Sequence, residues 1–264
     1  MNTLDIRKQG SQHGAIGHIW LNRPELRNAF NDATIREITE AFQSMGSDPE
    51  IRVIVMGAHG KAFSAGGDLN WMRAMADYSW DENHADATGL ANMLWAIANC
   101  PVPVIARVQG DCYGGGVGLV AACDIAVAVD TAHFSLSEVK LGLIPATISP
   151  YVIRAMGPRA AHRWFLTAER FNAQEALRIG FVHEVVTADQ LDAKVGELVS
   201  ALTSTSPNAV RECKKLVQDV AERDITRLLI ERTVEGIADI RASGEGKEGV
   251  QSFLQKRKPA WLAS

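Results

Sequence analysis

The feature that most constrains the fold of this chain is the alternation of strand-like and helix-like segments along its first two thirds. Residues 14–22 (GAIGHIWLN) and 52–58 (RVIVMGA) have the pattern of β-strands, and the second is apolar enough to be buried. Residues 31–45 between them begin with an Asn-Asp pair typical of a helix N-cap and carry apolar residues at helical spacing. Further strands are expected within residues 101–110 and 123–136. This alternation predicts an α/β fold.

The last third of the chain has a different pattern. Residues 172–186 predict a short helix that ends at a glycine, followed by a strand. From residue 188 onward only helical patterns follow. We therefore expect an α/β core in residues 1–190 and a helical region in residues 191–264 that packs on the core or on another subunit.

Composition excludes several classes of protein. With 264 residues, 47% of them hydrophobic and 22% charged, the chain is close to the average of soluble globular proteins. Its net charge of −4 argues against nucleic-acid binding driven by overall charge. The N-terminus lacks the apolar segment of a secretory signal, and no apolar run reaches the roughly 20 residues of a spanning helix. We expect a cytoplasmic protein with no membrane partner.

Cysteine and histidine spacing argues against a metal site. The four cysteines form no CxxC pair and lie in apolar or small-residue surroundings, so we expect buried free thiols. The seven histidines have no metal-ligand spacing.

Two glycine-rich segments follow predicted strands. They are GKAFSAGGDL, residues 60–69, and YGGGVGLVAACDIAVA, residues 113–128. Backbone N–H groups at a helix start attract negative charge, so two such turns side by side could aim two N–H groups at one oxygen. Neither segment has the glycine spacing of a phosphate-binding loop. From the glycines alone, close packing of a helix on a strand is at least as good an explanation.

The combination of segments resembles one known family. NRPELRNAF, KAFSAGGDL, GGGVGLVAACDIAVA, AHFSLSEVKLGLIP and GPRAAHRWFLTAERFNAQEALRIGFVHEVV occur in the order and spacing of the enoyl-CoA hydratase/isomerase family, also called the crotonase superfamily. The resemblance covers essentially the whole chain. LNWMRAM, LSEVKLGLIPATISPYVIRAMG and FLQKRKPAW look most like the bacterial methylglutaconyl-CoA hydratases of leucine degradation.

The resemblance implies a fold, an assembly and a reaction. The fold would be a crotonase-like superhelix of ββα units with two stacked sheets and helices outside. Residues 1–190 would form the core that binds acyl-CoA, and residues 191–264 a helical region for subunit packing in a homo-oligomer, a trimer or a dimer of trimers. The reaction would be hydration of an α,β-unsaturated CoA thioester in fatty acid or leucine catabolism, with coenzyme A as part of the substrate and no separate cofactor.

The resemblance also assigns site residues. The thioester carbonyl would lie between the backbone N–H groups of Ala65 and Gly115, which stabilise the enolate. Arg27 would lie near the nucleotide end of coenzyme A. The segment along the pantetheine and acyl group would be Ala65, Gly66, Gly67, Asp68 and Leu69. Glu138 would be the general acid–base carboxyl, with a pKa raised by an apolar cleft.

Position 118 departs from the family pattern. The best-known hydratases carry a second glutamate there, but this chain has Gly118. Glu138 could act alone, another acid such as Asp111 or Glu82 could assist, or the enzyme could be an isomerase. A non-catalytic module that binds CoA or RNA is a further alternative, which retention of Glu138 disfavours. We expect Gly118 to leave room for a water near Glu138 and to avoid a charge that would repel a carboxylate on the substrate.

Overall fold

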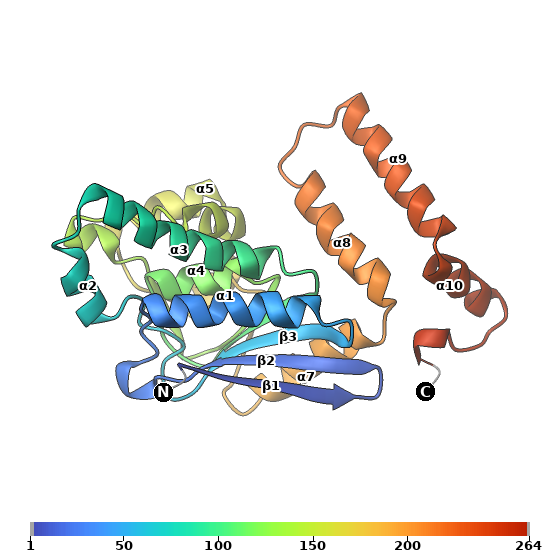
Figure 1. Ribbon diagram of the computed structural model, residues 1–264, viewed down its shortest axis with the longest axis horizontal. Helices are drawn as coiled ribbons and strands as arrows, with labels where there is room; N and C mark the ends of the chain where they lie inside the picture. The colour runs from blue at the N-terminus through green and yellow to red at the C-terminus, as the bar shows by residue number, and fades with distance from the viewer. Residues whose placement is uncertain (1–2, 263–264) are drawn as a thin grey trace.

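The computed structural model describes residues 3–262 and has one large and one small β-sheet (Figure 1). The large sheet has the order β1-β2-β3-β4-β6-β9, with β1 and β2 antiparallel and every other neighbouring pair parallel. Its strands are β1 (Leu4–Ser11), β2 (Gly14–Leu21), β3 (Ile51–Ala58), β4 (Val104–Val108), β6 (Ile125–Val129) and β9 (Glu184–Val186). The predicted α/β fold is confirmed.

The small sheet has the order β5-β7-β8. Its strands are β5 (Cys112–Tyr113), β7 (His133–Ser135) and β8 (Phe171–Asn172). β5 runs parallel to β7, and β7 runs antiparallel to β8. This sheet brings the start of the triple-glycine segment next to the strand that precedes Glu138.

Ten α-helices and three short 3-10 helices lie within residues 3–262. The α-helices are α1 (Asp32–Ser47), α2 (Leu69–Met75), α3 (Trp80–Ala98), α4 (Gly115–Ala122), α5 (Ser149–Thr167), α6 (Ala173–Arg178), α7 (Leu191–Thr203), α8 (Pro207–Val220), α9 (Arg227–Ala242) and α10 (Gly244–Leu254). The 3-10 helices are η1 (Pro24–Leu26), η2 (Glu138–Leu141) and η3 (Ala260–Leu262). None of these helices is both long and apolar enough to cross a membrane.

Helix α1 forms for the reasons that its sequence predicts. The side chain of Asn31 accepts a hydrogen bond from the Thr34 N–H at 3.1 Å and so caps the first turn. Ile35, Ile38 and Phe42 lie on one face of the helix and are buried. Figure 1 shows this helix between the first strands and the helices α3 and α4.

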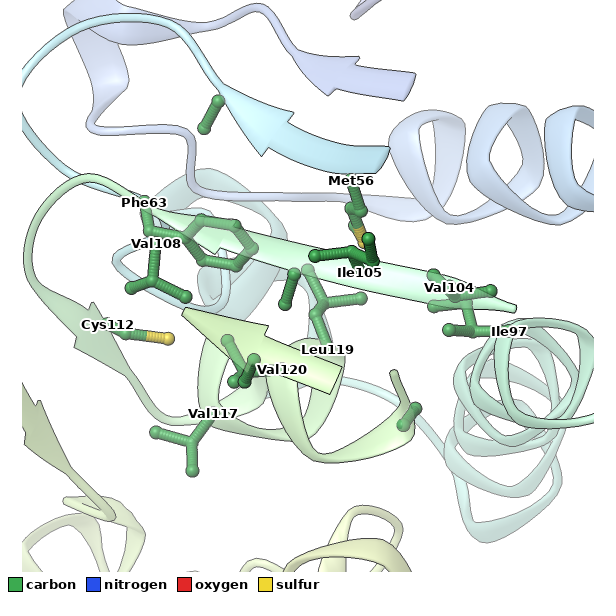
Figure 2. Close-up of a cluster of buried hydrophobic side chains, with 14 of the residues drawn as sticks. Met56, Phe63, Ile97, Val104, Ile105, Val108, Cys112, Val117, Leu119 and Val120 are labelled. Atoms are coloured by element: carbon green, nitrogen blue, oxygen red, sulfur yellow. The ribbon is translucent and has the colours of Figure 1, made fainter. Parts of the chain in front are cut away.

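Helix α4 is buried in the centre of the core. Figure 2 shows Val117, Leu119 and Val120 of this helix among side chains of β3 and β4, with Phe63 from the loop after β3. Nearly every residue of α4 is buried, which explains why its sequence has no polar face.

The C-terminal helices divide into two groups. Leu191, Val195 and Val199 of α7 are buried, and this helix packs against β3, β4 and β6. α8 and α9 have no buried residue, and Figure 1 shows α8, α9 and α10 extending away from the sheet. The predicted boundary at residue 190 lies before α7. In the structure α7 still packs on the large sheet, and the helices without buried residues begin with α8.

The four cysteines are free thiols. Cys100 and Cys112 are buried, as expected, but Cys213 is exposed on α8 because that helix packs so little against the core.

Candidate active site

The loop after β3 is held by hydrogen bonds on both of its edges. On one edge, the Tyr113 N–H donates to the Ser64 carbonyl at 2.9 Å, which joins the loop to the triple-glycine segment. On the other edge, the Phe30 N–H donates to the Gly66 carbonyl at 2.9 Å, and the Asp68 N–H donates to the Phe30 carbonyl at 2.9 Å. The peptide groups between these anchors are therefore fixed in orientation.

Between Phe63 and Asp68, the part of the loop next to the triple glycine, the free N–H group belongs to Gly67. The Ala65 N–H donates to the Arg27 carbonyl at 2.9 Å, so the predicted donor at Ala65 is corrected. The Phe30 pairing uses the groups on either side of Gly67, and the Gly67 N–H has no acceptor among residues 3–262. It is therefore available to a substrate.

Gly115 supplies a second free N–H group. It is the first residue of α4, where intrahelical acceptors are lacking, and its N–H has no partner in the described part of the chain. The two loops are in contact: a Cβ atom placed on Gly66 would lie 2.9 Å from the Tyr113 carbonyl oxygen and 3.5 Å from the Gly115 nitrogen. Both free donors thus belong to adjoining turns.

At each position of the triple glycine, the backbone conformation or a close neighbour disfavours a side chain. Gly114 has a φ of 50°, which favours glycine, and a Cβ there would lie 3.3 Å from Glu138 Oε1. A Cβ on Gly115 would overlap the ring of Phe30, and one on Gly116 would lie 2.8 Å from the Ser64 Cβ. Close packing and the free donor at Gly115 therefore occur together.

Glu138 has a half-buried side chain beside the triple glycine. It begins η2, and its Oε2 atom is buried without a hydrogen-bond partner among residues 3–262. Burial raises the pKa of this carboxyl above its ordinary value. A carboxyl that holds its proton more tightly than an exposed glutamate is a stronger base once ionised, and it can return the proton that it accepts.

The structure gives Asp68 a structural role. The carboxylate accepts from the Asn70 N–H at 2.8 Å, which caps α2, and pairs with the Arg23 guanidinium at 2.8 Å. Burial alone would raise the pKa of Asp68, but these hydrogen bonds outweigh burial and lower the pKa. The carboxylate oxygens of Asp68 are used within the fold, and the contact of this segment with substrate stays a prediction.

Leu69 and Arg27 are exposed. Leu69 begins α2 with a side chain that is 70% accessible, which leaves it free to contact an acyl or pantetheine group. Arg27 has a φ of 51°, and its carbonyl holds Ala65 while its side chain faces solvent.

The expected open space beside Gly118 is absent among the described residues. A Cβ placed on Gly118 would overlap Ile148 Cγ2 and lie 2.8 Å from Ile148 Cβ. Leu94 of α3 would lie 3.6 Å away. The prediction that Gly118 accommodates water or substrate is corrected: Ile148 fills the position.

The other acids that could assist Glu138 are engaged elsewhere. Glu82 caps its own helix, accepting from the Ser79 N–H and hydroxyl at 2.8 Å each. Asp111 accepts from the Tyr113 hydroxyl at 2.7 Å and from the His133 N–H at 3.1 Å. Of the carboxylates in residues 3–262, Glu138 alone has a buried oxygen without a partner. In the same range, no cluster of three His, Cys, Asp or Glu side chains is arranged to hold a metal ion.

Two residues beside the glycine turns, Phe30 and Ile148, were not singled out by the sequence analysis. Phe30 and Ile148 fill the space beside Gly115 and Gly118, and Trp71 would lie 3.4 Å from a Cβ on Gly67. Trp71 is anchored by a hydrogen bond of 2.9 Å from its indole N–H to Asp86. Phe30 lies inside the family-like segment NRPELRNAF, but no sequence signal pairs it with a glycine 85 positions later.

Comparison with known proteins gives a consistent result. The family model described as enoyl-CoA hydratase/isomerase matches residues 11–263. An enoyl-CoA hydratase from Shewanella pealeana has a TM-score of 0.94 and 42% identity, covering 98% of this chain and 96% of that one. One from Mycobacterium smegmatis has a TM-score of 0.92 and 32% identity, with 99% of each chain covered. An enoyl-CoA hydratase from Alternaria alternata is 34% identical over 272 residues, which is 99% of this chain and 88% of the relative.

Proposed function

Because the chain belongs to the enoyl-CoA hydratase/isomerase family and is a hydratase-type enzyme, we propose that it hydrates methylglutaconyl-CoA, an α,β-unsaturated CoA thioester. One juxtaposition supports the chemistry. The free N–H groups of Gly67 and Gly115 lie in adjoining turns, and the carboxyl of Glu138, with its buried Oε2 atom, packs against the second turn. Support for the acyl group comes from residues 136–157, whose sequence is like that of methylglutaconyl-CoA hydratases.

The reaction begins with polarisation of the thioester. Its carbonyl oxygen accepts hydrogen bonds from the Gly67 and Gly115 N–H groups, at the roughly 2.7–3.1 Å typical of an oxyanion hole. These donors stabilise the negative charge that develops on the oxygen when the β-carbon is attacked. Because both donors are backbone groups fixed by the fold, they need no reorganisation during the reaction.

Glu138 moves the proton. Its carboxylate takes a proton from water as the water oxygen bonds to the β-carbon and the π electrons shift to the enolate. The carboxyl then gives the proton to the α-carbon, and the carbonyl re-forms. One carboxyl suffices because it returns to its starting state, so the missing glutamate at position 118 leaves the proton balance complete.

The test compares two substrates and two variants. We expect the wild-type protein to remove the absorbance of the conjugated thioester of methylglutaconyl-CoA and, more slowly, of crotonyl-CoA. Glu138→Gln should lower kcat by at least about 10²-fold with little change in substrate affinity, because it keeps the shape and removes the proton carrier. Glu82→Gln, a change in an exposed helix cap, should keep kcat.

Isomerisation is the second candidate, favoured by the same single carboxyl. An isomerase only needs to move one proton between two carbons. Conversion of a β,γ-enoyl-CoA to the conjugated isomer, without hydration of either conjugated substrate, would replace hydration by isomerisation as the function.

The proposal includes the assembly and the location. Trimers, alone or as dimers of trimers, would cover the apolar side chains that α8–α10 expose, with Phe253 81% accessible and Val217 65% accessible. The proposed reaction uses no cofactor beyond the coenzyme A of the substrate, and we expect it to take place in the cytoplasm.

A further inference from the structure

We propose that Phe30 is a positioning residue that sets the separation of the two N–H donors, an inference that rests on the proposed function. Phe30 precedes α1 and is 1% accessible. Its backbone holds the turn that contains Gly67, and its ring fills the space beside Gly115. One residue thus contacts both donor turns directly.

The backbone of Phe30 fixes the Gly67 donor. Its N–H donates to the Gly66 carbonyl and its carbonyl accepts from the Asp68 N–H, both at 2.9 Å. These two bonds flank Gly67 on either side. The direction of the Gly67 N–H is therefore set relative to the Phe30 backbone.

The ring of Phe30 fixes the Gly115 donor. A Cβ atom on Gly115 would overlap the Phe30 Cζ atom and lie 3.3 and 3.4 Å from the two Cε atoms, so the tip of the ring touches the Gly115 backbone. The ring is supported from another side by Trp71, with centroids 6.3 Å apart and planes tilted by 48°. An aromatic ring that is buried and supported in this way is a rigid spacer.

Removal of the ring should change the distance between the donors. A leucine at position 30 keeps both backbone hydrogen bonds but does not reach Gly115, so α4 is free to settle toward the space left behind. Misplacement of one donor should lower kcat by about 10- to 100-fold, because displacements on the order of 1 Å and losses of single donors have effects of this size. KM should change much less, since most contacts of a CoA thioester lie away from its carbonyl.

The experiment compares Phe30→Leu with Phe42→Leu. Phe42 is also 1% accessible but lies on α1, so the control removes the same atoms from the core without touching a donor turn. The readout is the carbonyl stretching band of a bound unsaturated thioester, measured by difference infrared spectroscopy. We expect the band to be shifted from its solution frequency in wild type and Phe42→Leu, and to move back toward that frequency in Phe30→Leu.

A second pair of variants tests the contact itself. Gly115→Ala should lose the shifted band and most of kcat, because its methyl group would overlap the Phe30 ring. Phe30→Leu combined with Gly115→Ala should recover part of both, since the shorter side chain makes room for the methyl group. If Phe30→Leu does not fold, as judged by its circular dichroism melt against Phe42→Leu, Phe30→Met takes its place with the same expectation.

The outcomes separate this inference from the function on which it rests. An unshifted band in the wild-type protein would overturn the oxyanion hole. A shifted wild-type band that Phe30→Leu leaves in place, or a double variant no better than Gly115→Ala, would overturn only the role of Phe30.

Discussion

At the scale of single residues, the catalytic role proposed for Glu138 comes with a cost to stability. Its Oε2 atom is buried without a partner, and burial raises the pKa of the carboxyl. The folded state therefore holds the proton over a pH range in which the unfolded state has lost it. Stability from this group is complete below the unfolded pKa and is lost as pH rises through the folded pKa.

Glu138→Gln should therefore be more stable than the wild-type protein at pH 8 and similar to it near pH 4. The amide cannot ionise, so it avoids the buried charge that weakens the wild-type protein at higher pH. Thermal melts of both proteins across this pH range measure the difference. A constant difference in Tm at every pH would mean that the ionisation of Glu138 is not coupled to folding.

Also at the scale of single residues, the contacts of Gly118 indicate that close packing is the reason for glycine at this position. Gly118→Ala should destabilise the protein by about 1–3 kcal/mol, the usual cost of overpacking, because the methyl group would overlap Ile148. Gly196→Ala in α7 is the matched control: nothing lies within 4 Å of its added Cβ, so it should stabilise by roughly 0.5–1 kcal/mol. Urea unfolding measures both values.

The activity of Gly118→Ala shows whether glycine at position 118 serves the packing of α4 or the recognition of a charged acyl group. Distortion of α4 should lower kcat/KM for methylglutaconyl-CoA and crotonyl-CoA by the same factor, because α4 carries the Gly115 donor for both substrates. A selective loss on one substrate would show that position 118 senses the acyl group.

The structure agrees with the predicted free N–H group at Gly115 and disagrees with the one predicted at Ala65. The donor at Gly115 was implied by the family resemblance, because the glycines alone fit close packing of a helix on a strand at least as well. The choice of Ala65 instead of Gly67 was wrong because pairing with Phe30 and Arg27 decides which N–H groups of the loop are free. Contacts between residues as distant as Gly118 and Ile148 leave no pattern in a single sequence.

At the scale of elements, local signals were sufficient for most of the core. The cap at Asn31 predicted the start of α1, and the apolar runs predicted β2, β3, β4, β6 and β7. Strand β1 was not predicted because only Leu4 of its eight residues is buried, so it has no alternation of apolar and polar residues. It is a strand because it pairs with β2 along its whole length, which its own sequence does not indicate.

One partly buried ion pair ties a C-terminal helix to this core. Lys214 of α8 contacts Asp124 at 2.7 Å, and Asp124 also accepts from the Val104 N–H at 2.7 Å. Lys214→Met should destabilise the protein by about 1–3 kcal/mol, because Asp124 would remain as a partly buried charge without its partner. Lys215→Met removes the same charge from the exposed neighbouring position and should have an effect below about 0.5 kcal/mol. Equal melting temperatures of the two variants would mean that the pair does not hold α8.

At the scale of the whole molecule, the chain has a well-packed core and a helical extension without a core of its own. The large sheet, α4 and α7 share buried contacts, whereas α8 and α9 have no buried residue. On α9, Ile230, Val234 and Ile237 are exposed at spacings of four and three residues, which places them on one face of the helix. An amphipathic face of this kind is stable in water when another protein surface covers it.

Val234→Lys should therefore weaken the assembly while leaving the core folded. Val234 is 59% accessible in the single chain, so lysine has room there, but burial of its ammonium group in a subunit interface is costly. We expect light scattering at micromolar concentration to give a trimer or hexamer for the wild-type protein and a smaller species for the variant. Glu235→Lys introduces the same residue at the adjacent exposed position, away from the apolar face, and should keep the wild-type mass. A monomeric wild-type protein would contradict the proposed assembly, and an unchanged mass for Val234→Lys would move the interface to another face of α8–α10.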